Sequence, residues 1–386
     1  MKMAKSLLGF GMMRLPVKNG NAAEIDFERL NPMVDAFLEA GYNYFDTSYM
    51  YHNGMSEEAV KKAVVERYPR EKVMIATKFP PFVLQEESQI EPIFEEQLQK
   101  LGVDYVDYYM IHNVQTVFYD GLDGRGGIIP KTNLFEHLKK WRETGRAKHI
   151  GISFHSSPVL LERVLTEHPE LDFVQLAINY IDWDSEMVQA KSCYEIVRKH
   201  GKQVIVMEPV KGGALACLPE NAERILKAET PDQSVVSWAF RFLASLDGVI
   251  TILSGMSTIG QVQDNIKTME DISPLSDKER VALEKAIKVY RDHAPIPTDV
   301  IEKYRGLTYH GLSATAILET CSICQVQPDP TFTDDINYPQ NALAENVHVD
   351  IDCDESFPEE IVLLPDGTDG TPLLKQAENW LRKHHF

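Results

Sequence analysis

The chain has 386 residues, 44% of them apolar, and a formal net charge of −19. This acidic balance argues against nucleic acid or an anionic membrane as a partner, because both attract basic surfaces. No apolar run reaches the roughly 18 residues that a membrane-spanning helix requires. The five cysteines, and a first apolar patch that runs straight into Arg14 rather than into a cleavage site, favour a cytoplasmic protein over a secreted one.

Short apolar strands alternate with longer amphipathic helices over most of the chain. Strands are predicted over residues 7–13, 42–46, 72–78, 105–111, 147–153, 172–178, 203–207 and 248–253. Helices are predicted over residues 27–41, 56–68, 89–102, 133–146, 157–168, 185–201, 231–245 and 257–269. Four of these helices end at a glycine, where a left-handed residue closes a helix: Gly41, Gly102, Gly145 and Gly201.

This alternation predicts an α/β fold, a (β/α)8 TIM barrel, because parallel strands require helical crossovers. An open doubly wound sheet is the alternative, but no G-x-G-x-x-G follows a strand, so its usual phosphate loop is missing. We place the barrel in residues 1–293, including one more helix that starts near Ser276. Residues 294–386 form an irregular C-terminal extension of unknown role, rich in Pro, Asp and Glu, with a helix pattern only at 372–386.

Polar side chains stand at the ends of three consecutive predicted strands. Asp46 ends the second strand, Lys78 ends the third and His112 follows the fourth, while Tyr51 comes a few residues after Asp46. The active site of a barrel of this kind lies at the carboxyl ends of its strands, so these four side chains are expected to converge.

Each of the four also has an ordinary structural explanation. A lysine at a strand end is usually solvated, a single histidine is more often structural than catalytic, and an aspartate after a strand often starts a turn. Their joint occurrence at neighbouring strand ends favours one shared active site over several unrelated placements.

Five segments carry a resemblance to a known family: FDTSYMYHNGMSE, IATKFP, VDYYMIHN, GRAKHIGIS and ILSGMSTIGQVQDN. In this order they resemble the aldo-keto reductase family, over roughly residues 7–293. The resemblance implies a barrel that binds NADPH or NADH without a Rossmann domain and reduces a small-molecule aldehyde or ketone to an alcohol. It leaves the oligomeric state and the physiological substrate open.

The resemblance also implies roles for the four strand-end residues. Carbonyl reduction requires a proton at oxygen, and a tyrosine with its ordinary pKa near 10 holds a proton at neutral pH. Tyr51 matches the proton donor, Lys78 the ammonium that stabilises the phenolate, and Asp46 the carboxylate that pairs with the lysine. His112 matches the residue that orients the substrate carbonyl. His52 is interpreted as a bystander near the pocket rim.

Cofactor contacts follow from the same resemblance. Ser153 and Gln175 match the residues that bind the nicotinamide amide, although Phe154 replaces the asparagine that commonly follows the serine. Glu208 stands where a tyrosine often stacks on the nicotinamide ring. Gly255 and Gln261 occupy positions where many members carry cations for the 2′-phosphate, so we expect only a modest preference for NADPH. The other predicted cofactor contacts are Met207, Pro209, Gly213, Ser254, Met256, Asp264 and Asn265.

The C-terminal extension holds three of the five cysteines, Cys321, Cys324 and Cys353. The barrel sequence resembles a bacterial subgroup that often ends in a ferredoxin-like C-x2-C-x2-C-x3-C-P run, but only the first two cysteines of that run are present. An iron–sulfur cluster would need a fourth ligand, and zinc with the three thiolates and His348 or His310 is the other possibility. We favour no metal, and free thiols in an irregular tail.

Two alternative functions stay open from the sequence. One is a non-catalytic, nicotinamide-binding redox sensor or partner subunit, which has no need of Tyr51. The other is a barrel enzyme of different chemistry, such as a lyase or isomerase, which would bind no nicotinamide cofactor. The complete set of four residues favours the reductase.

Overall fold

The structure is a computed structural model that describes residues 7–121, 124–185, 188–270, 272–326 and 360–385. The chain divides into two compact units. The barrel unit comprises Met1–Ile178, Ala190–Pro209 and Phe240–Pro274. The second unit comprises Asn179–Gln189, Val210–Ala239 and Leu275–Phe386. The domain boundary at residue 293 stays a prediction.

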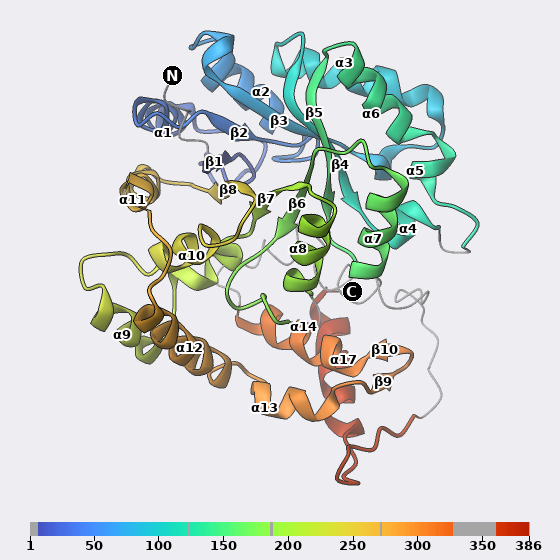
Figure 1. The fold of residues 1–386 in the computed structure, drawn as a ribbon, viewed down its shortest axis with the longest axis vertical. Coiled ribbons are helices and arrows are strands. Elements are labelled where there is room, and N and C mark those ends of the chain that lie inside the picture. The colour runs from blue at the N-terminus through green and yellow to red at the C-terminus, as the bar shows by residue number, and fades with distance from the viewer. Residues whose placement is uncertain (1–6, 122–123, 186–187, 271, 327–359, 386) are drawn as a thin grey trace. The chain divides into compact units, whose positions relative to one another are not determined.

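Strands β1 to β8 pair in parallel, each with its sequence neighbour, and β1 pairs with β8 to close a barrel. Their bounds are β1 Leu8–Gly11, β2 Tyr44–Asp46, β3 Met74–Phe79, β4 Val106–Val114, β5 Ala147–Phe154, β6 Phe173–Ala177, β7 Gln203–Met207 and β8 Val249–Gly255. This confirms the predicted (β/α)8 barrel, and each strand overlaps its predicted range. In Figure 1 the strands run through the centre of the barrel unit.

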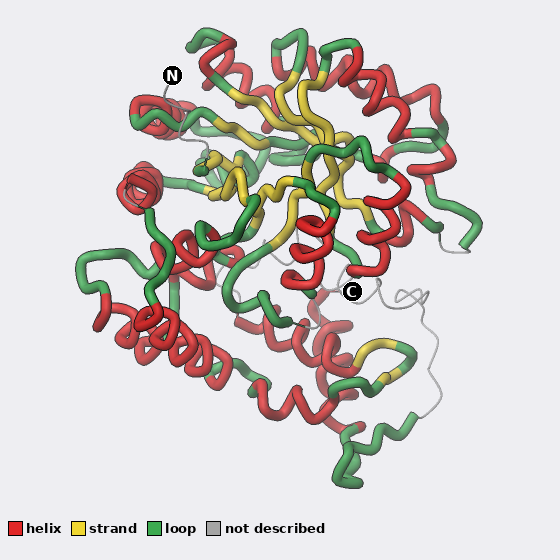
Figure 2. Tube along the Cα trace, viewed as in Figure 1, coloured by secondary structure: helices red, strands yellow, loops and turns green. Residues whose placement is uncertain are grey.

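Helices follow the strands of the barrel unit and lie outside them (Figure 2). The main ones are α1 Phe27–Glu39, α2 Ser56–Val60, α3 Ile90–Leu101, α6 Leu134–Glu143, α7 Pro158–Glu167, α8 Ala190–Lys199 and α11 Ile259–Glu270. Shorter ones are α4 Thr116–Tyr119 and α5 Ile128–Lys131, and α10 Val236–Leu243 crosses the sequence boundary between the units. Short turns are η1 Lys61–Val65, η2 Arg70–Lys72, η3 Pro81–Val83 and η4 Glu87–Gln89.

The helix ends mostly follow the sequence prediction. Gly41, Gly102, Gly145 and Gly201 all have positive φ, between 68° and 90°, which confirms that they close helices in the left-handed conformation. The helix predicted over residues 56–68 differs, because α2 passes into the single π-helical turn η1. There the amide of Glu66 donates to the Lys61 carbonyl, five residues back, at 2.9 Å.

The barrel interior is filled by side chains rather than open. One layer consists of Tyr44, Ala76, Met110, Phe173, Ile205 and Leu253. A Cβ atom on Gly151 would lie 2.5 Å from the carbonyl oxygen of Phe173, so only glycine fits there. The polar residues above this apolar layer are therefore held by a packed base.

The second unit has its own helices and a two-stranded sheet. The elements are η5 Lys211–Ala216, α9 Glu220–Glu229, α12 Asp277–Asp292, α13 Thr298–Ile301, η6 Glu302–Tyr304, β9 Thr308–Tyr309, β10 Leu312–Ser313, α14 Ala314–Val326 and α17 Thr371–His385. As predicted, a helix begins near Ser276: this residue is the N-cap of α12, and its side chain and that of Glu279 form a reciprocal cap. The helix pattern at 372–386 is confirmed by α17.

The prediction of few regular segments beyond residue 294 is wrong for α14. This helix packs against α17 in a small apolar core with Tyr304, Leu318 and Leu374. Residues 314–318 of α14 are all buried, so the helix lacks the one-sided periodicity that marks an amphipathic helix. Within the described residues, no helix is both long enough and apolar enough to cross a membrane.

Candidate active site

The carboxyl ends of β2 and β3 bring an acid, an ammonium and a phenol together. Lys78 Nζ lies 2.5 Å from Asp46 Oδ1 and donates to the Thr47 carbonyl at 2.8 Å. The same nitrogen lies 4.7 Å from the centre of the Tyr51 ring, within the range of a cation–π contact. Lys78 is only 1% exposed and Asp46 3%. The structure thus places three of the four predicted catalytic residues in contact.

The charges of this group are strongly coupled. Burial opposes the charge of Lys78, but the Asp46 carboxylate and the Tyr51 phenol outweigh it and raise the pKa of the lysine. Burial raises the pKa of Tyr51, with Lys78 opposing this and Asp46 and Glu208 adding to it. Burial also raises the pKa of Asp46, against the pull of Lys78. At neutral pH the group therefore holds an ammonium beside a protonated phenol.

The fourth predicted residue, His112, lies on β4 in an irregularity of the ladder between Ile111 and Val114. Such bulges turn side chains toward active sites. Its ring meets the Tyr51 ring edge-on, with centroids 6.0 Å apart, and its Nδ1 lies 3.1 Å from Ser48 Oγ. Burial, then the charge of Lys78, lowers the pKa of His112 well below its ordinary value, so the imidazole is neutral.

The loop that carries Tyr51 is fixed at both ends. The Ser56 hydroxyl at the start of α2 accepts from Thr47 Oγ1 at 2.7 Å. His52 adopts a positive φ of 55°, and its Nε2 accepts from the Leu15 amide at 3.0 Å. His52 therefore supports the loop, in agreement with its interpretation as a bystander.

An aromatic shelf adjoins the histidine. Phe82 lies 5.8 Å from the ring of His112 and 6.2 Å from that of Phe118, and it is 38% exposed. Phe79, at the end of β3, does not contribute to this shelf, because it is fully buried and packs against Trp141. The sequence analysis did not predict Phe82 as a site residue, although its position shortly after β3 places it at the carboxyl end of a barrel strand.

The predicted nicotinamide contacts Ser153 and Gln175 lie side by side on β5 and β6. Gln175 Nε2 donates to Asp46 Oδ2 at 3.1 Å, so the Gln175 side chain reaches the carboxylate that pairs with Lys78. The backbone N–H of Asn113 donates to Ser153 Oγ at 2.8 Å, while the side-chain oxygen Asn113 Oδ1 is buried without a hydrogen-bond partner in the described part of the chain. The sequence did not predict Asn113 as a site residue. Its position beside Ser153 depends on the irregular pairing of β4 with β5, which the sequence does not show.

The ends of β7 and β8 hold the remaining predicted contacts in the barrel unit. Glu208 follows Met207 and precedes Pro209, and its φ of 55° is an uncommon conformation for a residue with a side chain. Gly213 belongs to the second unit, so its relation to the site stays a prediction. Asn265 Nδ2 donates to Ser254 Oγ at 2.8 Å, which ties α11 to the end of β8.

The side chain of Gln261 caps the N-terminal end of α11. Its Oε1 accepts from the amides of Ser257 at 2.8 Å and Thr258 at 3.1 Å. Gly255 is exposed at the end of β8, and a Cβ on it would lie 3.2 Å from Arg14 Cγ. The two other predicted residues here are Met256, which is buried, and Asp264, which is half-buried.

The cysteines of the second unit give little sign of a metal site. Cys321 and Cys324 lie on α14, and burial raises the pKa of Cys321 to about 11. His310 lies 3.4 Å from Glu378. Among the described residues, no group of three or more potential ligands could hold a metal ion, while Cys353 and His348 lie outside that part of the chain. The prediction of no metal remains a prediction.

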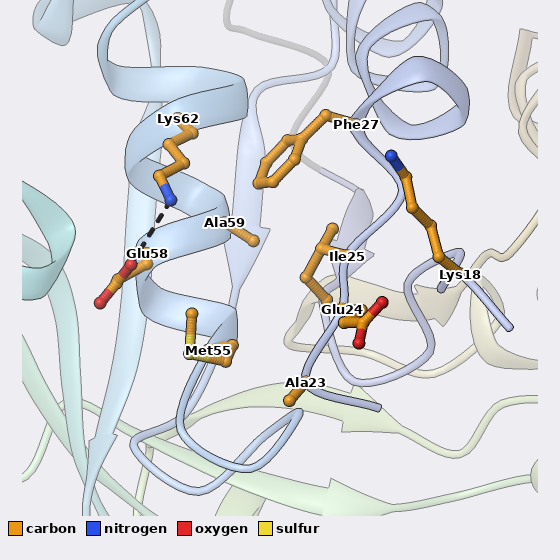
Figure 3. Close-up of a pocket in the computed structure, with 9 residues that line it drawn as sticks. All are labelled: Lys18, Ala23, Glu24, Ile25, Phe27, Met55, Glu58, Ala59 and Lys62. Atoms are coloured by element: carbon orange, nitrogen blue, oxygen red, sulfur yellow. Dashed lines mark ion pairs between the residues drawn. The ribbon is translucent and has the colours of Figure 1, made fainter. Parts of the chain in front are cut away.

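A hollow of about 280 Å³ lies apart from these residues, beside α1 and α2 (Figure 3). Inside it, Lys62 pairs with Glu58 at 3.5 Å and lies 5.7 Å from the Phe27 ring. The nine residues that line it are Lys18, Ala23, Glu24, Ile25, Phe27, Met55, Glu58, Ala59 and Lys62. None of them is a predicted site residue.

Glu57 is a buried carboxyl directly after the Tyr51 loop. Its Oε1 accepts from Thr77 Oγ1 and Gln97 Nε2, both at 2.7 Å. Burial raises the pKa of Glu57 from an ordinary 4.5 to about 7, these hydrogen bonds and Lys100 oppose the shift, and Glu96 adds to it. The folded protein therefore binds a proton here that the unfolded chain releases.

This shift predicts a pH-dependent stability that Glu57→Gln removes. A raised pKa stabilises the folded state fully below pH 4.5, and that stabilisation is lost as the pH rises through about 7. The unfolding free energy of the wild type minus that of Glu57→Gln should fall by about 3 kcal/mol between pH 4.5 and 7.5. Urea unfolding of both proteins across this range measures it, and a difference that does not change with pH contradicts the assignment.

Comparison with known proteins agrees with the fold. The model of the aldo/keto reductase family matches residues 7–288. The chain is 28% identical to aldehyde reductase YPR1 of Saccharomyces cerevisiae, over 71% of this chain and 89% of the relative. It is 24% identical to the uncharacterized oxidoreductase YqkF of Bacillus subtilis, over 75% of this chain and 95% of the relative.

Solved structures resemble this one in fold. Aldo-keto reductase AKR11C1 from Bacillus halodurans, in its holo form, matches with a TM-score of 0.57 and 25% identity, over 72% of this chain and 91% of that chain. The chain therefore belongs to the aldo/keto reductase family. It is an NAD(P)H-dependent oxidoreductase that reduces carbonyl compounds. Membership of this family favours the reductase over the two alternative functions.

Proposed function

We propose that this protein reduces small aldehydes or ketones to alcohols, with Tyr51 as the proton donor. The contact of the buried Lys78 ammonium with both Asp46 and the Tyr51 phenol carries the proposal. Asp46 holds the ammonium in place, and the ammonium stabilises the phenolate that remains after the proton leaves. General acid catalysis of this kind contributes about 10²–10⁴-fold to a rate.

His112 has the chemistry to orient the substrate in this scheme. His112 Nδ1 lies 3.1 Å from Ser48 Oγ; in the tautomer in which Nδ1 accepts a hydrogen bond from this hydroxyl, the neutral imidazole carries its proton on Nε2 and can donate it in a hydrogen bond to a carbonyl oxygen. Phe82 and Phe118 offer an apolar surface beside it for the rest of the substrate.

The residues at the ends of β4 to β6 fit a nicotinamide. The buried, unpartnered Asn113 Oδ1 can accept a hydrogen bond from a carboxamide, and it lies next to Ser153 and to the end of β4. Asn113 thereby offers an amide where Phe154 replaces the expected asparagine. The reduced nicotinamide, when bound, supplies the hydride, and Ser153, Gln175 and Asn113 would orient its amide.

A panel of carbonyl compounds tests the proposal. Aryl aldehydes, alkyl ketones and sugar aldehydes are each added with NADPH to the full chain, and consumption is followed at the nicotinamide absorbance band. We expect at least one of these classes to be reduced, at a rate that depends on the presence of both the carbonyl compound and NADPH. NADPH binding without turnover of any of these classes would instead support the non-catalytic alternative.

The cofactor preference is a separate prediction. Neither Gly255 nor Gln261 offers a cation to a 2′-phosphate, although Arg29, which donates to the Ser257 carbonyl at 3.2 Å, lies at this segment. We expect initial rates with NADPH and NADH at equal concentration to differ by less than about a hundredfold. The reason is that a single cation near the 2′-phosphate stabilises NADPH less than two cations that both contact this phosphate. A larger preference for NADPH contradicts this.

A cytoplasmic location and the absence of a nucleic-acid partner also stay predictions.

A further inference from the structure

A buried polar cluster lies on the outer side of β3, behind Lys78. Its members are Glu57 of α2, Thr77 of β3, Gln97 of α3 and Tyr109 of β4, and none of them exposes any surface. Side chains alternate along a strand, so Thr77 faces this cluster while Lys78 faces the opposite side, toward Asp46. The cluster and the catalytic group thus share one strand.

Gln97 is the centre of the cluster. Its Nε2 donates to Glu57 Oε1 at 2.7 Å and to the carbonyl oxygen of Lys78 at 3.0 Å. Its Oε1 accepts from the Tyr109 hydroxyl at 2.7 Å. Because these contacts engage both ends of the amide, the side chain has one orientation, and that orientation fixes the backbone of Lys78.

Lys78 is therefore held from two sides. On the inner side its ammonium meets Asp46 Oδ1 at 2.5 Å and the Thr47 carbonyl at 2.8 Å. On the outer side Gln97 holds its carbonyl, and Glu57 holds Gln97. The inner contacts set the direction of the ammonium, while the outer contacts fix the point from which the side chain extends.

This arrangement carries a cost that stability alone does not explain. Glu57 Oε2 is buried and has no hydrogen-bond partner within the described residues. A buried polar atom without a partner is destabilising, and apolar side chains of similar size would fill the same space without that penalty. A role in positioning Lys78 explains why these buried residues are polar rather than apolar.

We infer that Glu57 and Gln97 form a clamp of positioning residues, which keeps the Lys78 ammonium against the Tyr51 phenol. The inference rests on the proposed function, in which that ammonium stabilises the phenolate. When the clamp is loosened, the end of β3 moves and the ammonium withdraws from the phenol. The transition state loses stabilisation, while the residues expected to contact the cofactor are untouched.

The test uses Gln97→Met and Glu57→Gln, both close in volume to the wild type. Matched controls are Gln99→Met and Glu58→Gln, which alter exposed or half-exposed neighbours on the same helices. For each variant we measure kcat per mole of NADPH-binding protein, the dissociation constant of NADPH, and the pH profile of kcat.

We expect Gln97→Met to lower kcat by about tenfold and to leave the NADPH dissociation constant within about twofold. The alkaline limb of the kcat profile should move to higher pH, because a phenol without its ammonium neighbour keeps its proton longer. Glu57→Gln should act in the same direction but less strongly, since its amide oxygen can still accept. Both controls should match the wild type.

A double-variant comparison isolates the route through the lysine. In a Lys78→Met background, Gln97→Met should cause no further loss of kcat, because the clamp acts only through Lys78. A full additional loss would overturn the inference, as would an unshifted alkaline limb in both clamp variants. Loss of NADPH binding in both would show that the cluster maintains the fold instead, and would equally overturn it.

The outcome is distinguishable from failure of the proposed function. If Tyr51→Phe and Lys78→Met keep wild-type kcat, the assigned roles of these two residues fail, whatever the clamp variants do. If both lose activity while Gln97→Met and Glu57→Gln retain the wild-type kcat and pH profile, only the clamp fails.

Discussion

Replacing Tyr51 with phenylalanine should lower kcat for carbonyl reduction by about 10²–10⁴-fold and leave the NADPH dissociation constant within about twofold. The change removes one hydroxyl and keeps the ring that packs edge-on against His112. The site then lacks its proton donor, while the residues expected to bind the cofactor are unchanged. Steady-state rates and fluorescence titration with NADPH measure the two quantities.

Tyr49→Phe is the matched control for this experiment. Tyr49 lies on the same loop and donates to Glu96 Oε2 at 3.1 Å, away from Lys78. Its loss should leave kcat close to that of the wild type. Full activity of Tyr51→Phe would remove the proton-donor role, and equal losses in both variants would point to a disturbed loop rather than to missing acid catalysis.

The second large effect concerns the buried ion pair. Asp46→Leu should lower the unfolding free energy by about 3–5 kcal/mol, because it leaves the Lys78 ammonium buried without its carboxylate. Adding Lys78→Met to this variant should recover most of the loss, since the volume is kept and no unpaired charge remains. Both variants should be inactive. Urea unfolding followed by circular dichroism measures the difference.

An exposed pair on the same unit serves as the comparison. Glu58 and Lys62 are 3.5 Å apart with half-exposed side chains, so Glu58→Gln should change the unfolding free energy by less than about 1 kcal/mol. If Asp46→Leu costs no more than this, or if the double variant is no more stable than Asp46→Leu, the ion pair does not have the burial and coupling described here.

The barrel, and the approach of Asp46 to Lys78 at its strand ends, could be predicted because local patterns indicate them. Each strand is a short apolar run followed by an amphipathic helix, and parallel pairing leaves few other arrangements. Asp46 and Lys78 were singled out by their positions at strand ends, and Tyr51 by its place in the loop after Asp46 together with the family resemblance. The helix α14 could not be predicted in the same way, because its burial on all sides erases the periodicity on which such predictions depend.

The supporting residues of the site were beyond prediction for a different reason. Gln97 lies on an ordinary amphipathic helix, and nothing in the sequence shows that its amide reaches the backbone of Lys78. Asn113 gains its place from a ladder irregularity between Ile111 and Val114. Both depend on tertiary contacts between distant segments, whereas sequence patterns report local ones.

Closure of the barrel between Leu8 and Ile252 also matters for how the chain folds. These two residues belong to the first and last barrel strands, so the contact that completes the sheet has a very large sequence separation and forms slowly. During synthesis on the ribosome, β1 emerges long before β8 exists and shows an unpaired row of backbone donors and acceptors. The nascent chain therefore carries an aggregation-prone edge until its final barrel strand has been made.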